Sequence, residues 1–402
     1  MANYTFGFSE RQPTTRVLLR INKKMAAAVK IIPKFLVSLL VLCLLIGGPK
    51  SNVAKADIIL SEPLTVRWRY ESSVTLNLTP ASDVERVYLP LAGGVVVALR
   101  AIDGQLFWRS EIGGELSASP IADESNVYVA SEIVDSGGQQ PNSSGALRAL
   151  GREGGVTKWL TPLVKPLRGG IALSGEKLFA GGSDGRAYAF DKRTGGVMWS
   201  IPFASPFNGQ PVVDGGRVYF GSEDGTLFAL EESTGKLLWR FKTKGPIRGP
   251  VAVAHGTVFF GSGDAYVYAV EAKNGRQQWR KRTGAGVVAV IFSGETLLVA
   301  SLDNFAYLLN QKGSMLWKRL LPGRIPAQPL ALKDAALFTP LSSSTAVVLA
   351  LKDGKQVNAL PTGEEMTSSA APIVVADAVF VTTEHGFIAF ARPVDTGTKQ
   401  ER

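Results

Sequence analysis

Short apolar runs alternate with turn residues along most of the chain. The clearest unit extends from Pro211 to Trp239 and contains four apolar runs, separated by Asp214-Gly215-Gly216, Asp224-Gly225 and Thr234-Gly235. Glycine supplies the positive φ that a tight hairpin needs, so each run is predicted to be a β-strand. The unit is therefore predicted to be a four-stranded antiparallel sheet.

One tryptophan marks the fourth run of almost every unit. Successive tryptophans are separated by 40, 51, 40, 40, 40 and 38 residues, at Trp68, Trp108, Trp159, Trp199, Trp239, Trp279 and Trp317. A period of about 40 residues with four strands per unit is typical of a β-propeller. Because every tryptophan has the same place beside small residues, we expect the indoles to dock adjacent blades together and not to bind a ligand.

The two ends of the repeat region complete each other. Residues 372–392 supply three strands without a fourth, whereas 64–70 form a fourth strand, with Trp68, that lacks the first three. The prediction is an all-β fold: an eight-bladed β-propeller of four-stranded blades, whose last blade is closed by the N-terminal strand. Asn358 stands where the seventh blade lacks its tryptophan.

The N-terminal region has the pattern of a secretory signal. Residues 35–46 are apolar apart from Ser38, follow two lysines, and precede Ala54-Lys55-Ala56, a small-x-small cleavage pattern. We therefore expect an N-terminal extension and signal peptide at 1–56, a propeller at 57–392, a polar tail at 393–402, and a periplasmic location. Met25 is an alternative start, and a retained anchor or a lipid on Cys43 stays open.

The formal charge of +10 comes mostly from this N-terminal region. Nine of the 44 basic and one of the 34 acidic residues lie in 1–56, which leaves 35 and 33 and a net charge of about +2. Net charge thus gives no reason to expect nucleic acid as a partner. Beyond residue 56 the chain has no cysteine, so an oxidising compartment poses no risk of mispairing.

No constellation of catalytic, metal-binding or cofactor-binding residues is predicted. The aspartates of the second hairpins lie one in each unit, where Asp favours turn geometry. Two histidines without a ligand cluster do not make a metal site. The residues concerned are Asp184, Asp224, Asp264, Asp303, His255 and His385.

Two further segments depart from a lean repeat. Residues 131–145 form an insertion rich in Gly, Ser, Gln and Asn, which favours a flexible surface loop. The basic runs 280–282 and 318–319, with Arg324, are expected to protect outer strands from edge pairing, and a cationic strip is the alternative.

The segment from Ala229 to Trp239, Ala-Leu-Glu-Glu-Ser-Thr-Gly-Lys-Leu-Leu-Trp, resembles the tryptophan-docking motif of pyrroloquinoline-quinone-type propeller repeats. That superfamily includes quinoprotein dehydrogenases and non-catalytic rings. In size, blade number and lean repeats the chain is most similar to the BamB-type outer-membrane-protein assembly factors. This resemblance implies a non-catalytic scaffold that binds a protein partner and has no cofactor. It also implies that the chain is a monomer within a complex, with the β-barrel assembly machinery as the candidate partner.

The resemblance also suggests partner-binding residues. In that family a Leu-Arg-Gly step precedes the first strand of a blade, and here it matches Leu167, Arg168 and Gly169. The next equivalent loop is acidic in the family but offers only Asn208 here, and the step recurs two blades on at Ile247 and Arg248. A ligand-binding or sensor propeller is the alternative. A quinone-dependent dehydrogenase is disfavoured, because the vicinal cysteines usual in that class are missing beyond residue 56.

Overall fold

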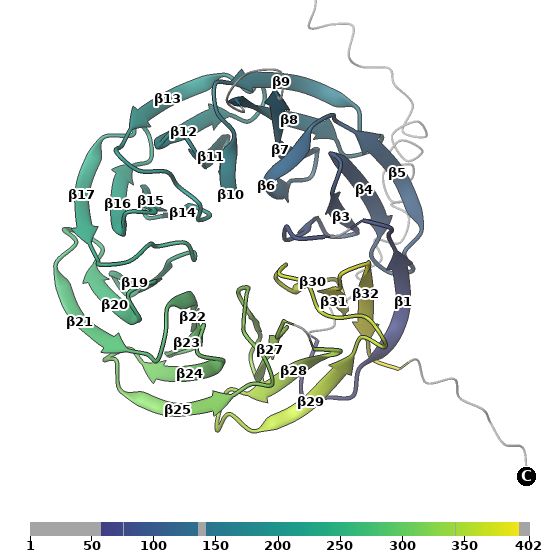
Figure 1. Cartoon of the computed structure of the whole chain (residues 1–402), viewed down its shortest axis with the longest axis vertical. Helices are drawn as coiled ribbons and strands as arrows, with labels where there is room; N and C mark the ends of the chain where they lie inside the picture. The colour runs from purple at the N-terminus through teal and green to yellow at the C-terminus, as the bar shows by residue number, and fades with distance from the viewer. Residues whose placement is uncertain (1–57, 75, 136–141, 342, 394–402) are drawn as a thin grey trace, which may run out of the picture. The chain divides into compact units, whose positions relative to one another are not determined.

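The described residues form a ring of antiparallel sheets with no helix (Figure 1). The computed structural model describes residues 58–74, 76–135, 142–341 and 343–393. The predicted signal peptide with Cys43 lies outside these residues, as do the centre of the insertion and nearly all of the C-terminal tail. None of the described residues belongs to a helix that could cross a membrane.

The described residues of the ring form thirty-two strands. One sheet contains β2 (Ala81–Ser82), β3 (Arg86–Leu91), β4 (Val95–Arg100) and β5 (Leu106–Glu111). An eight-stranded sheet joins β6 (Glu115–Ala122), β7 (Asn126–Asp135), β8 (Asn142–Gly151) and β9 (Thr157–Leu163) to β10 (Leu167–Ser174), β11 (Lys177–Gly182), β12 (Arg186–Asp191) and β13 (Val197–Pro202). Its two halves meet where Gly170 pairs in parallel with Ser119.

The other five sheets have four strands each. They comprise β14 (Val212–Asp214), β15 (Arg217–Gly221), β16 (Thr226–Glu231) and β17 (Leu237–Lys242); β18 (Ala252–Ala254), β19 (Thr257–Ser262), β20 (Tyr266–Glu271) and β21 (Gln277–Arg282); β22 (Val287–Ser293), β23 (Thr296–Ser301), β24 (Phe305–Asn310) and β25 (Met315–Leu320); β26 (Leu330–Ala331), β27 (Ala335–Phe338), β28 (Thr345–Ala350) and β29 (Gln356–Pro361); and β30 (Ile373–Val375), β31 (Ala378–Thr382), β32 (Gly386–Ala391) and β1 (Thr65–Glu71).

The predicted pairing of the N-terminal strand with the C-terminal sheet is confirmed. Strand β1 pairs antiparallel with β32 from Thr65 opposite Ala391 to Glu71 opposite Gly386. Trp68 faces Ala389 in this register. The same Ala–Trp pairing recurs inside other sheets, for example Ala229 opposite Trp239. The two ends of the chain thus build one sheet, and β1 lies on its outer side in Figure 1.

Every tryptophan reaches from its own four-stranded repeat to the next one. Each indole Nε1–H donates a hydrogen bond of 2.7–3.2 Å to a carbonyl of the following repeat, at Ala101, Arg152, Lys192, Glu232, Ala272, Gln311 and Leu351 in chain order. A glycine of that repeat lies against the indole, as Gly235 does against Trp199. Gly235 has φ +73°, and a Cβ there would lie 2.8 Å from the ring.

Asn358 occupies the one joint where the repeat lacks a tryptophan, and a different segment fills that joint. Its side-chain amide donates to the carbonyls of Leu60 and Glu62, at 3.1 and 2.7 Å. Leu60 is fully buried in a cluster that joins two neighbouring sheets. The residues that precede β1 therefore supply the apolar surface that an indole provides elsewhere.

The expectation of a loop at 131–145 is wrong for its described ends. Residues 131–135 extend β7, residues 142–145 extend β8, and the two strands pair from Asn126 opposite Gly151 to Asp135 opposite Asn142. Backbone pairing between the two arms outweighs a composition that is poor in strand formers. The insertion is a lengthened hairpin as far as it is described.

Candidate functional site

In each four-stranded unit a loop leads into the first strand, and a second hairpin joins the second and third strands. These loops and second hairpins lie on the same face of the ring. Backbone hydrogen bonds tie the two sets together, as from Glu223 to Pro206 and from Gly263 to Pro246. We call this side the mouth face. All six residues predicted to bind a partner lie in its loops or where β10 begins.

Three successive loops of the mouth face share one arrangement. Leu167, Phe207 and Ile247 are fully buried, and each anchors its loop in the core. The next residue in each loop is polar: Arg168, Asn208 or Arg248. We call these three the mouth residues. Each buried anchor fixes the loop backbone from which the neighbouring polar side chain extends.

Gly169 allows two of these loops to approach closely. Its φ is +72°, and a Cβ at this position would lie 2.6–2.7 Å from backbone atoms of Asn208 and Gly209. An L-residue would be strained there and would also clash with backbone. Glycine is therefore needed for the spacing of the Arg168 and Asn208 loops.

Arg168 is held by an ion pair. Its guanidinium lies 2.7 Å from the carboxylate of Glu132 on the lengthened β7, and its side chain is one-third exposed. The pair connects the two halves of the eight-stranded sheet. Arg168 is thus fixed at the mouth face with part of its surface open to solvent.

Arg248 is more open to solvent than Arg168. Its side chain is 64% exposed and donates two hydrogen bonds, of 2.8 and 2.6 Å, to the carboxylate of Glu223. Hydrogen bonding from Arg248 lowers the pKa of Glu223 despite its burial, with a smaller contribution from Asn208. The carboxylate in turn raises the pKa of Arg248. Glu223 therefore keeps its charge and orients Arg248 and Asn208.

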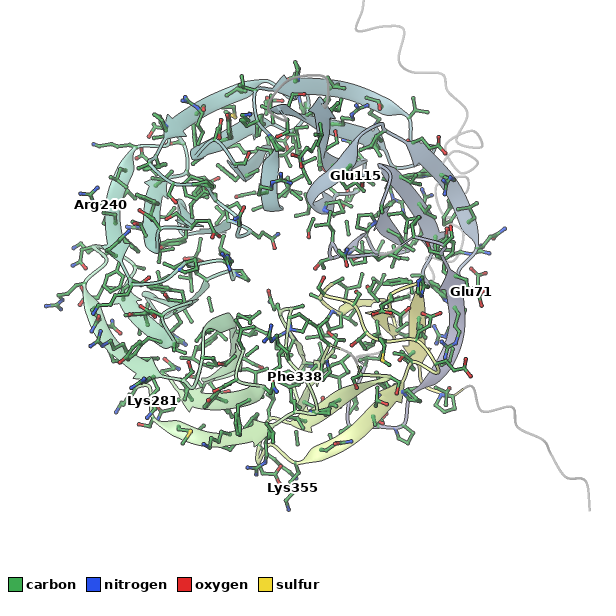
Figure 2. All side chains as sticks on the ribbon, in the orientation of Figure 1. Glu71, Glu115, Arg240, Lys281, Phe338 and Lys355 are labelled. Carbon is green, nitrogen blue, oxygen red and sulfur yellow. The ribbon has the colours of Figure 1, made fainter. Side chains whose placement is uncertain are left out.

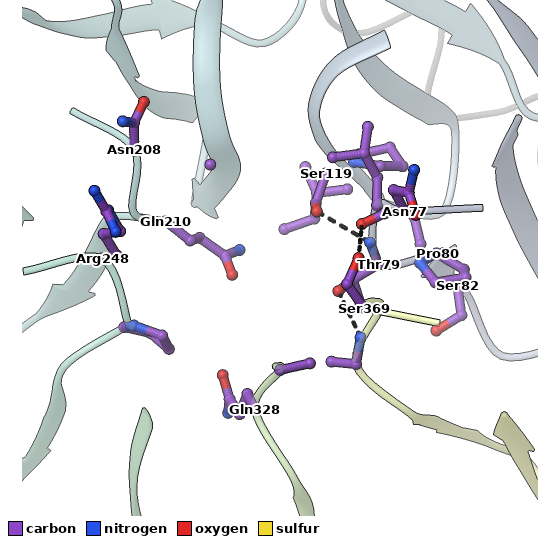
Figure 3. A pocket seen from close by; sticks show the side chains of 18 of the residues that line it. Asn77, Thr79, Pro80, Ser82, Ser119, Asn208, Gln210, Arg248, Gln328 and Ser369 are labelled. Carbon is purple, nitrogen blue, oxygen red and sulfur yellow. Dashed lines mark hydrogen bonds between the residues drawn. The ribbon is translucent and has the colours of Figure 1, made fainter. Parts of the chain in front are cut away.

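A cavity of about 480 Å³ opens beside the mouth residues (Figure 3). Gly169, Asn208 and Arg248 contribute to its wall, whereas Leu167, Arg168 and Ile247 do not. The wall also contains amides and hydroxyls that the sequence did not single out: Asn77, Thr79, Ser82, Ser119, Gln210, Gln328 and Ser369. The repeat spacing of about 40 residues is the sequence signal that could have found two of these residues. Gln210 lies two residues after Asn208, and Gln328 lies at the corresponding place in a later repeat.

Hydrogen bonds fix one side of the cavity. Ser119 accepts from the Thr79 amide at 3.2 Å, and Thr79 accepts from the Ala371 amide at 3.1 Å. On the opposite side Gln210 donates to the carbonyl of Ile171 at 3.0 Å. Among the described residues of the wall, Arg248 is the one charged residue and none is a carboxylate.

The aspartates of the second hairpins serve their turns. Asp184 accepts from the backbone amide of Arg186 at 3.0 Å and from the hydroxyl of Tyr188 at 2.6 Å. Asp264 has the same two kinds of partner in its own hairpin. Within the described ranges no three His, Cys, Asp or Glu residues are grouped in a way that could hold a metal ion.

Comparisons with known proteins agree with this architecture. The model of the family described as outer membrane protein assembly factor BamB matches residues 59–140, 143–248 and 224–401. Among solved structures, BamB from Moraxella catarrhalis is 16% identical with a TM-score of 0.66, and the match covers 85% of this chain and 99% of that one.

Two other solved structures show how widely the fold is shared. The computationally designed Ika8 protein is 14% identical with a TM-score of 0.70, covering 82% of this chain and 99% of its own. Quinohemoprotein alcohol dehydrogenase from Comamonas testosteroni is 13% identical with a TM-score of 0.68, covering 86% and 80%. At such identities the likeness concerns the fold alone. No curated protein matches the sequence significantly.

Proposed function

Because the chain belongs to the family of the outer membrane protein assembly factor BamB, we propose that it is a non-catalytic periplasmic scaffold. Its ring has eight four-stranded blades within residues 57–392, docked by the tryptophans. An N-terminal extension and signal peptide at 1–56 direct it to the periplasm and are cleaved off, and residues 393–402 form a polar tail. Its partner is a protein of the β-barrel assembly machinery, which it binds as a monomer within a complex.

The row of mouth residues is the observation that supports this function. Arg168, Asn208 and Arg248 lie on successive repeats, and each follows a fully buried anchor. Arginine is enriched among the residues that dominate protein interfaces. A pre-positioned polar row on one face suits recognition of a folded partner, since little side-chain freedom is lost on binding.

Binding to the host's central β-barrel assembly protein tests the proposal. Arg168→Gln and Arg248→Gln should each weaken binding about 10-fold or more, as for an interface hot spot. Arg109→Gln, which removes an exposed cation from the outer strand β5, is the matched control and should bind like the wild type. Isothermal titration calorimetry gives the affinities, and circular dichroism verifies that each variant is folded.

Glu132→Gln separates partner contact from internal support. It removes the ion-pair partner of Arg168 and leaves the arginine in place. If Arg168 contacts the partner, Glu132→Gln should weaken binding less than Arg168→Gln. Equal losses in the two variants would mean that the ion pair only supports the loop, and wild-type affinity in both arginine variants would refute the mouth face as the interface.

A ligand-binding ring is the second candidate function, and the amide-lined cavity is what favours it. A pocket of this size with a few convergent polar groups is a common form of small-molecule site. Native mass spectrometry of protein purified from its own host would show a bound small molecule if this function applies. A mass equal to that of the polypeptide would count against it.

A further inference from the structure

The outer wall of the ring carries a continuous positive sector. The outermost strands β17, β21 and β25 of three successive sheets contain seven basic residues and no acidic one: Arg240, Lys242, Arg280, Lys281, Arg282, Lys318 and Arg319. We call this set the basic wall. Figure 2 shows the labelled Arg240 and Lys281 on the outside of the ring.

Internal carboxylates neutralise little of this charge. Lys242 forms an ion pair with Asp224 at 2.9 Å. The other six basic residues form no ion pair with any described carboxylate. Arg280 lies over the ring of Tyr266 at 4.7 Å, and Arg319 donates to backbone carbonyls. These contacts orient the cations and leave their charge uncompensated.

Other outer strands do not share this composition. Strand β5 contains Arg109 and Glu111, and β1 contains two arginines and Glu71. Charges of both signs are sufficient to prevent edge-to-edge pairing. Strand β9 contains a single lysine, and β13 and β29 contain no charged residue. Edge protection therefore explains isolated charges but not two or three basic residues on each of three successive strands. With a net charge near +2 beyond residue 56, the excess is concentrated in one sector.

Exposed apolar side chains accompany the basic wall. Leu237 and Leu238 on β17 are each 41% exposed, and Leu316 and Leu320 on β25 are 53% and 66% exposed. Basic and large apolar side chains on one convex surface are the combination by which peripheral proteins bind anionic bilayers. A broad outer wall also suits a flat surface better than it suits a narrow peptide.

We propose that the basic wall docks on a membrane surface rich in anionic phospholipid headgroups. The lysine and arginine side chains contact the headgroup phosphates, while the leucines enter the interfacial layer. The basic wall borders the mouth face at Lys242, which pairs with Asp224, but it contains none of the mouth residues. Membrane contact through it therefore leaves those residues available for a partner. The proposal does not depend on the proposed scaffold function.

Vesicle cosedimentation of the full chain tests this docking. Wild-type protein should bind vesicles of phosphatidylcholine with about one-third phosphatidylglycerol more tightly than pure phosphatidylcholine, and the preference should fall with salt. The triple variant Arg240→Gln/Lys281→Gln/Arg282→Gln should bind the anionic vesicles about 100-fold more weakly. The apolar run at 35–46 is the same in every variant, so its contribution cancels.

The matched control removes the same residue types elsewhere. Arg109→Gln/Lys158→Gln/Arg193→Gln changes two arginines and one lysine, all exposed and outside the basic wall. This control should keep most of the wild-type binding. An equal loss in both triples would mean that net charge alone matters and would overturn the proposal. So would wild-type vesicle binding by the basic-wall variant, or binding of a polyglutamate peptide with no binding to anionic vesicles.

Discussion

Replacing Trp68 with alanine should loosen the ring at the joint between the two ends of the chain. Trp68 is 9% exposed and donates a 3.0 Å hydrogen bond to Ala101, and its ring lies against Gly104. Truncating a buried tryptophan to alanine costs about 3–5 kcal/mol. About 1 kcal/mol of this is the hydrogen bond, which Trp68→Phe should remove while keeping much of the packing.

Trp239→Ala is the matched comparison, because Trp239 is 7% exposed and donates a 2.9 Å hydrogen bond to Ala272. The same cost is expected there, but a hairpin continues to join its strand to the rest of its sheet. No hairpin joins strand β1 to its sheet, which holds it by pairing with β32 and by the contacts of Arg67 and Trp68. Hydrogen exchange of the β1 amides should therefore accelerate by about two to four orders of magnitude in Trp68→Ala. Equal acceleration of those amides in Trp239→Ala would refute the closure argument.

Two further predictions concern the seventh joint and the hairpin tyrosines. Asn358→Ala should lower the free energy of unfolding by about 1–3 kcal/mol, because two carbonyls lose their donor, and hydrogen exchange at residues 58–64 should rise. Burial, followed by the hydrogen bond to Asp184, raises the pKa of Tyr188 from 10.0 to about 12. Since the folded state disfavours the anion, this stabilisation is complete below pH 10 and is lost as pH rises towards 12. Denaturant titrations should show a smaller loss over that range in Tyr188→Phe than in the wild type.

The strands were predictable because turn chemistry is local. Asp-Gly and Thr-Gly pairs mark many of the hairpins, such as Asp224-Gly225 and Thr234-Gly235, and the spacing of the tryptophans gives the phase of the repeat. The lengthened β7–β8 hairpin was missed because its composition resembles a loop. Its strands form through pairing between two segments, which composition does not encode. The parallel pairing of Gly170 with Ser119 depends on two sheets meeting in space, and no local pattern marks it.

The cavity wall was harder to predict, because residues far apart in the sequence converge on it. Gln210 and Gln328 belong to different repeats, and each looks like an ordinary surface glutamine in its own unit. The period relates equivalent positions, but only the closed ring shows which of them face a common space. A comparison of the residues at this one position in all repeats would have found both glutamines.

On the mouth face, charged residues that are far apart in the sequence also come together. The loop that contains Asn208 lacks the acidic residues expected from the resemblance, yet a carboxylate is present beside it: Glu223 comes from the neighbouring hairpin and binds Arg248. Arg168 has its own carboxylate in Glu132. Both arginines are thus neutralised where they lie. Under the proposed function, long-range attraction would give a partner little help, and the partner would have to complete or replace these ion pairs. Recognition would then depend on geometry more than on net charge.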